Sequence, residues 1–336
     1  MTMTMRIILI VAGIVVVLLL LGYGALYYMT AVPGRPYQGA LPAITTEERE
    51  LAVRLQRHVE AIASRPHNVA HYEALEEAAR HIESALEGYG YRVDQQVYTA
   101  DGKAVRNSSV TIEPEGSPPS PETIVVGAHY DSAGTAPGAN DNGTGAAAVI
   151  ELSRLLADLK GKSAKRIHLV LFVNEERPYS KTPDMGSLRF AKMLSEKRER
   201  VVAMYSLETI GFYSDEPGTQ RYPKPFNWVF ADRGDFVAFV GTLESRKLVH
   251  DTMRSFRSHT SFPTIGGVAP GFIPDIDWSD HWAFAQQGFQ AIMVTDTAPF
   301  RYPHYHKPTD TPDKIDAEKL ARVVKGMERV ARDAAR

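Results

Sequence analysis

Two hydrophobic patterns follow one another along this chain of 336 residues. Residues 7–28 form a single run without a charged side chain, in which most positions are Ile, Val or Leu. Beyond residue 45, short apolar runs of the buried-strand type alternate with longer stretches that we assign to helices. This pattern predicts one membrane-type helix followed by a globular domain that contains both helices and strands.

The apolar run at 7–28 is long enough to cross a bilayer, since about 1.5 Å per residue takes it through the roughly 30 Å hydrocarbon core. Tyr23, Tyr27 and Tyr28 stand at its far end, where interfacial aromatic residues are favoured. The alternative is a cleavable signal peptide, but such apolar regions are usually shorter and no clear small-x-small cleavage site follows. We predict a cytoplasmic stub and transmembrane anchor at residues 1–29, with the rest of the chain outside the cytoplasm (periplasmic or extracellular).

Residues 30–44 contain three prolines and two glycines, which is typical of a linker. The folded domain is then expected over residues 45–336. Thr45 and Glu48 have the spacing of a capping box, so a helix should begin there and continue to about residue 64.

The rest of the domain alternates strands with helices, which predicts a three-layer α/β sandwich with a mostly parallel central sheet. In such folds ligands bind outside the carboxyl ends of the strands. We expect strands at 91–99, 107–113, 123–128, 166–173, 201–207 and 290–295, and helices at 71–88, 143–159, 186–196, 243–259 and 316–335.

Charge and composition exclude several classes of function. The chain has 38 basic and 40 acidic side chains, a formal net charge of -2, which argues against nucleic acid as a partner. It has no cysteine, so disulfides, thiolate metal sites and cysteine nucleophiles are excluded. Any transition-metal site must therefore use His, Asp and Glu.

Such residues follow several of the predicted buried strands and the loops beside them. One His or Glu at a strand end is more often structural or solvated than functional. Several together are different, because converging carboxylates repel one another and are costly to desolvate, and a divalent cation removes both problems. The residues concerned are His129, Asp131, Asp141, Glu175, Glu176, Glu208 and His306.

The sequence resembles peptidase family M28, the group of zinc aminopeptidases with two co-catalytic ions. The resemblance covers roughly residues 47–336 and implies a zinc-peptidase-like fold. It also implies hydrolysis of peptide bonds at the N-terminus of a peptide or protein. It rests on six segments in the family's order: AHYDS (128–132), GANDNGTG (138–145), FVNEE (172–176), LETIG (207–211), SDHWAF (279–284) and YHKPTDTPDKID (305–316).

Residue by residue, the resemblance implies two Zn²⁺ ions, with other divalent metals as alternatives. Glu175 matches the general base that acts on a metal-activated water, and Asp131 matches the group that orients His129. His304 is a rival to His306, but only His306 has the family's His-x-x-x-Asp-Thr context. The implied ligands are His129, Asp141 as the bridging carboxylate, Glu176, Glu208 (where the family often has Asp) and His306.

Other residues have structural interpretations. Asp280 and His281 are expected to form a hydrogen-bonded scaffold under the site rather than to bind metal. The stretch 177–184 is longer than the family's usual turn and is expected to cover the pocket. We expect the tryptophans to lie in the core or a pocket wall and the N-terminal histidines at the surface: Trp228, Trp278, Trp282, His58, His67, His71 and His81.

Two other functions remain open. Glutaminyl cyclases are similar in fold and keep fewer metals, but they usually lack a loop like GANDN. A non-catalytic ectodomain with a peptidase fold typically loses ligands or the base, and this chain keeps all of them. The absence of Gly-x-Ser-x-Gly and His-Glu-x-x-His disfavours a serine hydrolase and a gluzincin.

Overall fold

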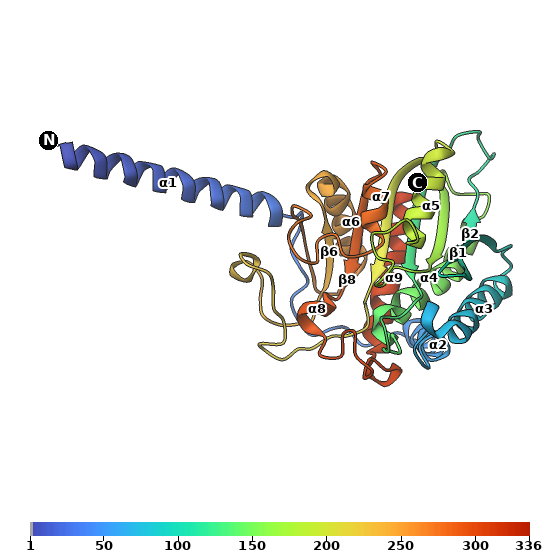
Figure 1. Cartoon of the computed structure of the whole chain (residues 1–336). Helices are drawn as coiled ribbons and strands as arrows, with labels where there is room; N and C mark the ends of the chain where they lie inside the picture. Colours follow the sequence, from blue (N-terminus) through green and yellow to red (C-terminus); the bar gives the residue numbers. More distant parts are fainter. Residues whose placement is uncertain (1–2) are drawn as a thin grey trace.

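The computed structural model describes residues 3–336, and it consists of one long helix attached to a globular body (Figure 1). The long helix, α1 (Met3–Thr30), has no buried residue and points away from the body. Within the described part of the chain it is the one helix long and apolar enough to cross a membrane. By length and composition α1 is either a signal sequence or a single membrane anchor.

The body is built around an eight-stranded sheet in the order β1-β2-β4-β3-β5-β8-β6-β7. The central strands β4, β3, β5 and β8 run parallel, while β1, β2 and β6 each pair antiparallel with a neighbour. The predicted mostly parallel sheet is therefore confirmed. The strands are β1 (Asp94–Ala100), β2 (Lys103–Ile112), β3 (Glu122–His129), β4 (Arg166–Phe172), β5 (Arg200–Glu208), β6 (Val237–Gly241), β7 (Thr264–Val268) and β8 (Ala291–Thr295).

Helices cover both faces of this sheet and bury a hydrophobic cluster on each, which gives the predicted three layers. The larger cluster lies under α2 (Thr46–Ile62), α3 (Tyr72–Gly88), α4 (Thr144–Leu155), α6 (Arg246–His259) and α9 (Ala317–Ala334). The smaller one lies under α5 (Gly186–Glu196) and α7 (His281–Ala285), and α8 (Ala298–Arg301) is a single turn after β8.

Local sequence signals place the first of these helices. The Thr45 hydroxyl accepts a hydrogen bond from the amide of Glu48 at 3.1 Å, and the Glu48 carboxylate accepts one from the amide of Thr45 at 2.8 Å. These two bonds confirm the predicted capping box. The five-residue elements β6, β7 and α7 were not predicted; β7 contains two glycines, and α7 is too short to show a helical period.

The predicted linker lies along the surface of the body instead of standing free. The Arg257 guanidinium donates to the carbonyl of Pro33 at 2.6 Å, and the Arg322 guanidinium donates to that of Pro42 at 2.6 Å. Val32 and Leu41 pack against the larger cluster. The exact domain boundaries, at residues 29 and 44, stay predictions.

The prediction that the N-terminal histidines lie at the surface is wrong for His58 and His67, both of which are buried. His58 faces Glu151, a fully buried carboxylate on α4, with 3.3 Å between its Nε2 and Oε1 of Glu151. Tyr89 donates to the same carboxylate at 2.7 Å, and Arg54 and Arg154 donate at 3.2 and 2.8 Å. A buried carboxylate needs such partners, so these residues tie α2 and α3 to α4.

Glu151→Gln is expected to lower the free energy of unfolding by roughly 2–4 kcal/mol at pH 7. Burial raises the pKa of Glu151, but hydrogen bonds from His58, Tyr89 and Arg154 outweigh burial and lower it to about 2. A lowered pKa stabilises the fold above the ordinary value of 4.5, and this contribution disappears as the pH falls toward about 2.

Urea titrations at pH 7, 5 and 3 measure this effect, with the exposed Glu77→Gln as the matched control. The difference between wild type and Glu151→Gln should shrink markedly at pH 3, whereas the control should stay near wild type throughout. A destabilisation of equal size at all three pH values would show that the charge of Glu151 is not its source.

Candidate metal centre

Three parallel strands deliver acidic and imidazole side chains to one edge of the sheet. His129 is the last residue of β3 and Glu208 the last residue of β5, while Glu175 and Glu176 follow the end of β4. These strands are neighbours and run in the same direction, so their carboxyl ends meet at one place. The strand-end argument therefore correctly predicts that these four residues converge.

The other two predicted ligands come from loops at the same edge. Asp141 lies between β3 and α4, and the buried Asp310 carboxylate holds this loop by accepting from the amides of Asn140 and Asp141 at 2.8 and 3.2 Å. His306 follows α8 and has a left-handed backbone with φ of 55°. Such a conformation is uncommon for residues other than glycine, and it persists where the surroundings require it.

Together these side chains form two triads that share Asp141. The first is His129, Asp141 and Glu208, and the second is Asp141, Glu176 and His306, with the atoms offered by each triad all within 4.8 Å of one another. In the first, Nε2 of His129 lies 3.4 Å from Asp141 and 3.3 Å from Glu208. In the second, Nε2 of His306 lies 3.0 Å from Asp141 and 3.2 Å from Glu176. A carboxylate common to two such groups has the geometry of a bridging ligand.

The hydrogen bonding of the triads is incomplete. Nε2 of His129, Oδ2 of Asp141 and Oε1 of Glu176 are buried without a hydrogen-bond partner. Two of these atoms lie 3.0 and 3.2 Å from Nε2 of His306 without forming a hydrogen bond to it. Buried polar atoms are nearly always satisfied in folded proteins, so unsatisfied atoms in both triads indicate missing ligands. Imidazole nitrogen and carboxylate oxygen are the donors that Zn²⁺ prefers when thiolates are absent.

The pKa values of the site residues also indicate that a cation binds here. Burial, together with the charge of Asp141, raises the pKa values of Glu176 and Glu208 to about 7 each. Burial lowers the pKa of His306, but Asp141 and Glu176 outweigh it and raise the value to about 10. Protons therefore compensate the charge of this cluster near neutral pH, and bound cations would replace them.

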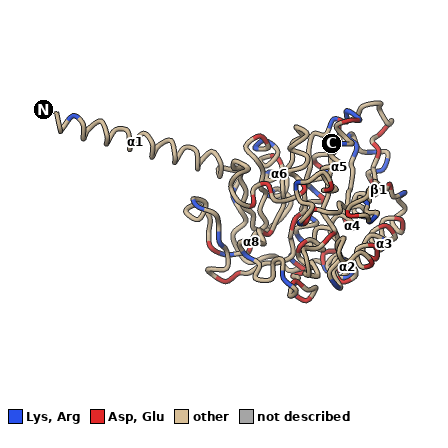
Figure 2. The backbone as a smooth tube through the Cα atoms, viewed as in Figure 1, with Lys and Arg blue, Asp and Glu red and all other residues tan. Residues whose placement is uncertain are grey.

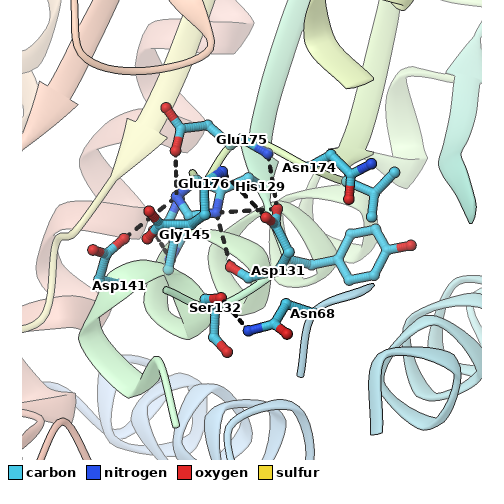
Figure 3. Close-up of polar contacts among 12 residues, drawn as sticks. Asn68, His129, Asp131, Ser132, Asp141, Gly145, Asn174, Glu175 and Glu176 are labelled. Atoms are coloured by element: carbon cyan, nitrogen blue, oxygen red, sulfur yellow. Dashed lines mark hydrogen bonds and ion pairs between the residues drawn. The ribbon is translucent and has the colours of Figure 1, made fainter. Parts of the chain in front are cut away.

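Glu175 lies beside the triads but belongs to neither. Its Oε2 is 3.9 Å from Nε2 of His129, and Figure 3 shows its carboxylate turned toward the same centre as His129, Asp141 and Glu176. Burial raises the pKa of Glu175 well above its usual value, and the charges of Glu176 and Glu208 add to this, whereas His129 opposes it. A carboxylate with a raised pKa in such a place is suited to proton transfer.

Asp131 contacts His129 mainly through its backbone. The carbonyl of Asp131 lies 3.0 Å from Nδ1 of His129, while its carboxylate is 3.6 Å from that nitrogen. The carboxylate instead accepts from the backbone amides of Glu175 and Glu176, at 3.1 and 3.2 Å (Figure 3). Asp131 thus positions the pair of glutamates as well as the imidazole, a role that the sequence did not suggest.

Several supporting residues were not predicted. The Ser279 hydroxyl donates to Glu208 at 2.7 Å, so the SDHWAF segment reaches the site through its serine. Asn142 accepts from the amide of Thr209 and donates to the carbonyl of Leu207, which fixes the end of β5. The motif segments contain both residues, but spacing alone does not reveal hydrogen bonds. As expected, the buried Asp280 and His281 lie outside the two triads.

The structure shows where the rival histidine, His304, and the long loop at residues 177–184 lie. His304 contacts Thr309, with 2.8 Å between Nδ1 and the hydroxyl, and it is outside both triads. The loop after Glu176 forms a wall of a cleft of about 1030 Å³ that opens beside the triads, as its length predicted. Other residues lining the cleft are Gly134, Thr135, Trp278, Tyr305 and His306.

Two of the three tryptophans lie where they were predicted. Trp282 packs against the smaller hydrophobic cluster, and Trp278 lines the cleft, although it is half exposed. Trp228 is 75% exposed and lines neither the cleft nor the core, so its prediction as a core or wall residue is wrong. It lies on a short turn of a loop between β5 and β6, where it has no strand or helix to pack against.

Comparisons with known proteins agree with this architecture. YfbL of Escherichia coli (strain K12), an uncharacterized protein, is 34% identical over 304 residues, which cover 87% of this chain and 91% of that protein. Aminopeptidase YwaD of Bacillus subtilis (strain 168) is 28% identical over 205 residues, 60% of this chain but only 38% of YwaD.

Two solved structures share the fold at low sequence identity. An aminopeptidase from Aneurinibacillus sp. strain AM-1 superposes with a TM-score of 0.63 at 18% identity, over 86% of this chain and 96% of that one. A glutaminyl cyclase from Fimbriiglobus ruber superposes with a TM-score of 0.61 at 19% identity, over 89% and 98%. Residues 107–331 match the sequence pattern of peptidase family M28. The chain therefore belongs to peptidase family M28.

Proposed function

We propose that this protein is a membrane-anchored, zinc-dependent aminopeptidase that hydrolyses the N-terminal peptide bond of peptides or proteins. The observation that carries the proposal is the shared carboxylate of Asp141, which joins two metal-type triads within reach of a buried glutamate that is free of both. Peptidases with two metals need this arrangement, because two ions a few ångströms apart act on one water and one carbonyl.

The side chains fit two zinc ions. His129 and Glu208 would hold one, Glu176 and His306 the other, and Asp141 would bridge them. When bound, the two ions supply Lewis acidity, which activates a water molecule and polarises the peptide carbonyl. The unsatisfied atoms of His129, Asp141 and Glu176 support this occupancy.

The protein's own contribution to proton transfer comes from Glu175. Its backbone amide donates to the Asp131 carboxylate, and its own carboxylate faces the triads without belonging to them. We assign it the role of accepting a proton from the attacking water and passing that proton to the leaving amine. The cleft beside it, walled by the loop after Glu176, offers space for a peptide.

Support for an aminopeptidase over a glutaminyl cyclase comes from the second triad. A cyclase with fewer metals has no need of a bridging carboxylate, whereas here Asp141 lies 3.0 Å from His306 as well as 3.4 Å from His129. The aminopeptidase relative is similar in sequence, while the glutaminyl cyclase is similar in fold alone. We place the domain outside the cytoplasm, with α1 as its anchor, because both uses of an N-terminal apolar helix lead there.

Removal of metal tests this proposal. The purified full chain is expected to contain two zinc ions per molecule by elemental analysis and to release N-terminal residues from short peptides. Treatment with 1,10-phenanthroline should abolish the activity, and added Zn²⁺ should restore it. Hydrolysis that persists without metal, or none in a metal-replete sample, would contradict the proposal, and pyroglutamate formation from N-terminal glutamine would favour the cyclase instead.

A further inference from the structure

The C-terminal end of α1, which carries no charged residue (tan in Figure 2), is in contact with the body. A Cβ atom added to Gly267 of β7 would lie 2.5 Å from the carbonyl oxygen of Met29, so the backbones of α1 and β7 are in close contact there. The Arg246 guanidinium of α6 lies 4.4 Å from the centre of the Tyr28 ring, and it donates to the Tyr28 carbonyl at 3.2 Å. The globular body therefore lies directly against the C-terminal end of the apolar helix.

Two loops near this junction carry large apolar side chains that are exposed to solvent. Trp228 is 75% exposed, Val229 is 43% exposed and Phe272 is 87% exposed. Their chain neighbours Phe226 and Pro274 line one small apolar pocket together with Thr30, the last residue of α1. The exposed side chains therefore lie close to the end of α1.

The shape of the molecule agrees with this placement. In Figure 1 the long segment between β5 and β6, which contains Trp228, projects from the body on the side where α1 leaves it. Lys224 on the same segment is exposed and has no ion-pair partner among residues 3–336. Exposed tryptophan, phenylalanine and lysine side chains on loops beside the end of an apolar helix are typical of a surface that contacts lipid headgroups.

We propose that the loops at residues 222–230 and 268–276 lie in the headgroup region of the bilayer that α1 spans, with Trp228, Val229 and Phe272 inserted. This rests on the proposed function of α1 as an anchor. Water would otherwise surround these apolar side chains, and a bilayer surface is already next to them once α1 is inserted. The domain then lies on the membrane instead of hanging from a flexible tether.

The contact has a consequence for the cleft. The loop that carries Phe272 continues to Trp278, which lines the cleft beside Glu175. A membrane contact through this loop therefore fixes the distance between the cleft and the lipid surface. Substrates would be peptide termini that reach the cleft from close to the membrane.

The chain has no cysteine, so single cysteines report individual positions without background. Full-length Trp228→Cys and Phe272→Cys are labelled with an NBD fluorophore and reconstituted in vesicles of phosphatidylcholine and phosphatidylglycerol. Lys192→Cys on α5 is the matched control, because its side chain is 67% exposed and α5 packs beside β2, at the other end of the sheet from β6 and β7. Nitroxide lipids should quench the first two labels about twofold or more and leave the third unchanged.

Flotation of the same vesicles keeps the anchor and the surface contact apart. Protein that fails to float with lipid overturns both the anchor and the contact. Protein that floats while nitroxide lipids quench all three labels equally, or none, overturns the contact and leaves the anchor standing. A blue shift at 228 and 272 without nitroxide quenching would assign the patch to a protein partner and would also overturn the lipid contact.

Discussion

Glu175→Gln should retain close to the wild-type zinc content while lowering kcat/KM by about 10²–10⁴-fold. The amide has nearly the shape of the carboxylate but cannot accept a proton from water at neutral pH. Glu175 lies outside both triads, so its replacement removes no proposed ligand. Elemental analysis for zinc and steady-state kinetics on an aminoacyl p-nitroanilide, measured on the same preparation, test both halves of this expectation.

The exposed Glu196→Gln on α5 is the matched control, because it makes the same chemical change far from the site. It should leave both zinc content and turnover unchanged. Near-normal turnover in Glu175→Gln would refute its assignment as the general base. Loss of zinc in that variant would show instead that Glu175 acts as a ligand.

The fold was predictable because its central strands are buried on both faces. Strands such as β3 and β4 appear in the sequence as continuous apolar runs, and the alternation with helices leaves few other arrangements. β6 and β7 escaped prediction because each is short, and Gly266 and Gly267 interrupt the apolar signal of β7. Their place in the sheet depends on the pairing of β6 with β8 and of β7 with β6, which the sequence does not encode locally.

The sequence predicted the main residues of the candidate site but not the hydrogen bonds that support them. Residues at strand ends, such as His129 and Glu208, are brought together by the direction of parallel strands, and pattern reasoning captures that direction. The choice of His306 over His304 came from the family context, and the structure brings His306 to Asp141. The hydrogen bonds from Ser279 and to Asp310 connect segments far apart in sequence, so no local pattern contains them.

The exposure of Trp228 differs from what its residue type predicts. A tryptophan is usually at least partly buried, because its large ring gains most from leaving water. That average assumes that water is the only alternative to the core. The proposed anchoring by α1 adds a bilayer surface as a third environment, in which an exposed Trp228 is the expected result of the same preference.

Asp141→Ala is expected to weaken the binding of both zinc ions by about 100-fold or more and to abolish peptidase activity. Every proposed ligand except Asp141 belongs to one triad alone. Glu208→Ala should therefore lose mainly the ion next to His129, and Glu176→Ala mainly the ion next to His306. Zinc titration with a competing chelator separates these cases, since the three variants should hold about none, one and one ion.

The comparison among the three variants is more informative than any one loss of activity. All three remove a buried carboxylate from the same cluster, so a general loss of stability would affect them alike, and circular dichroism with urea titration reveals it. Two independent metal sites would make Asp141→Ala resemble the other two variants, with one ion retained. Only a shared ligand predicts that this one substitution removes both ions. The Asp141 carboxylate is close to the imidazoles of both triads, with oxygens 3.4 Å from Nε2 of His129 and 3.0 Å from Nε2 of His306.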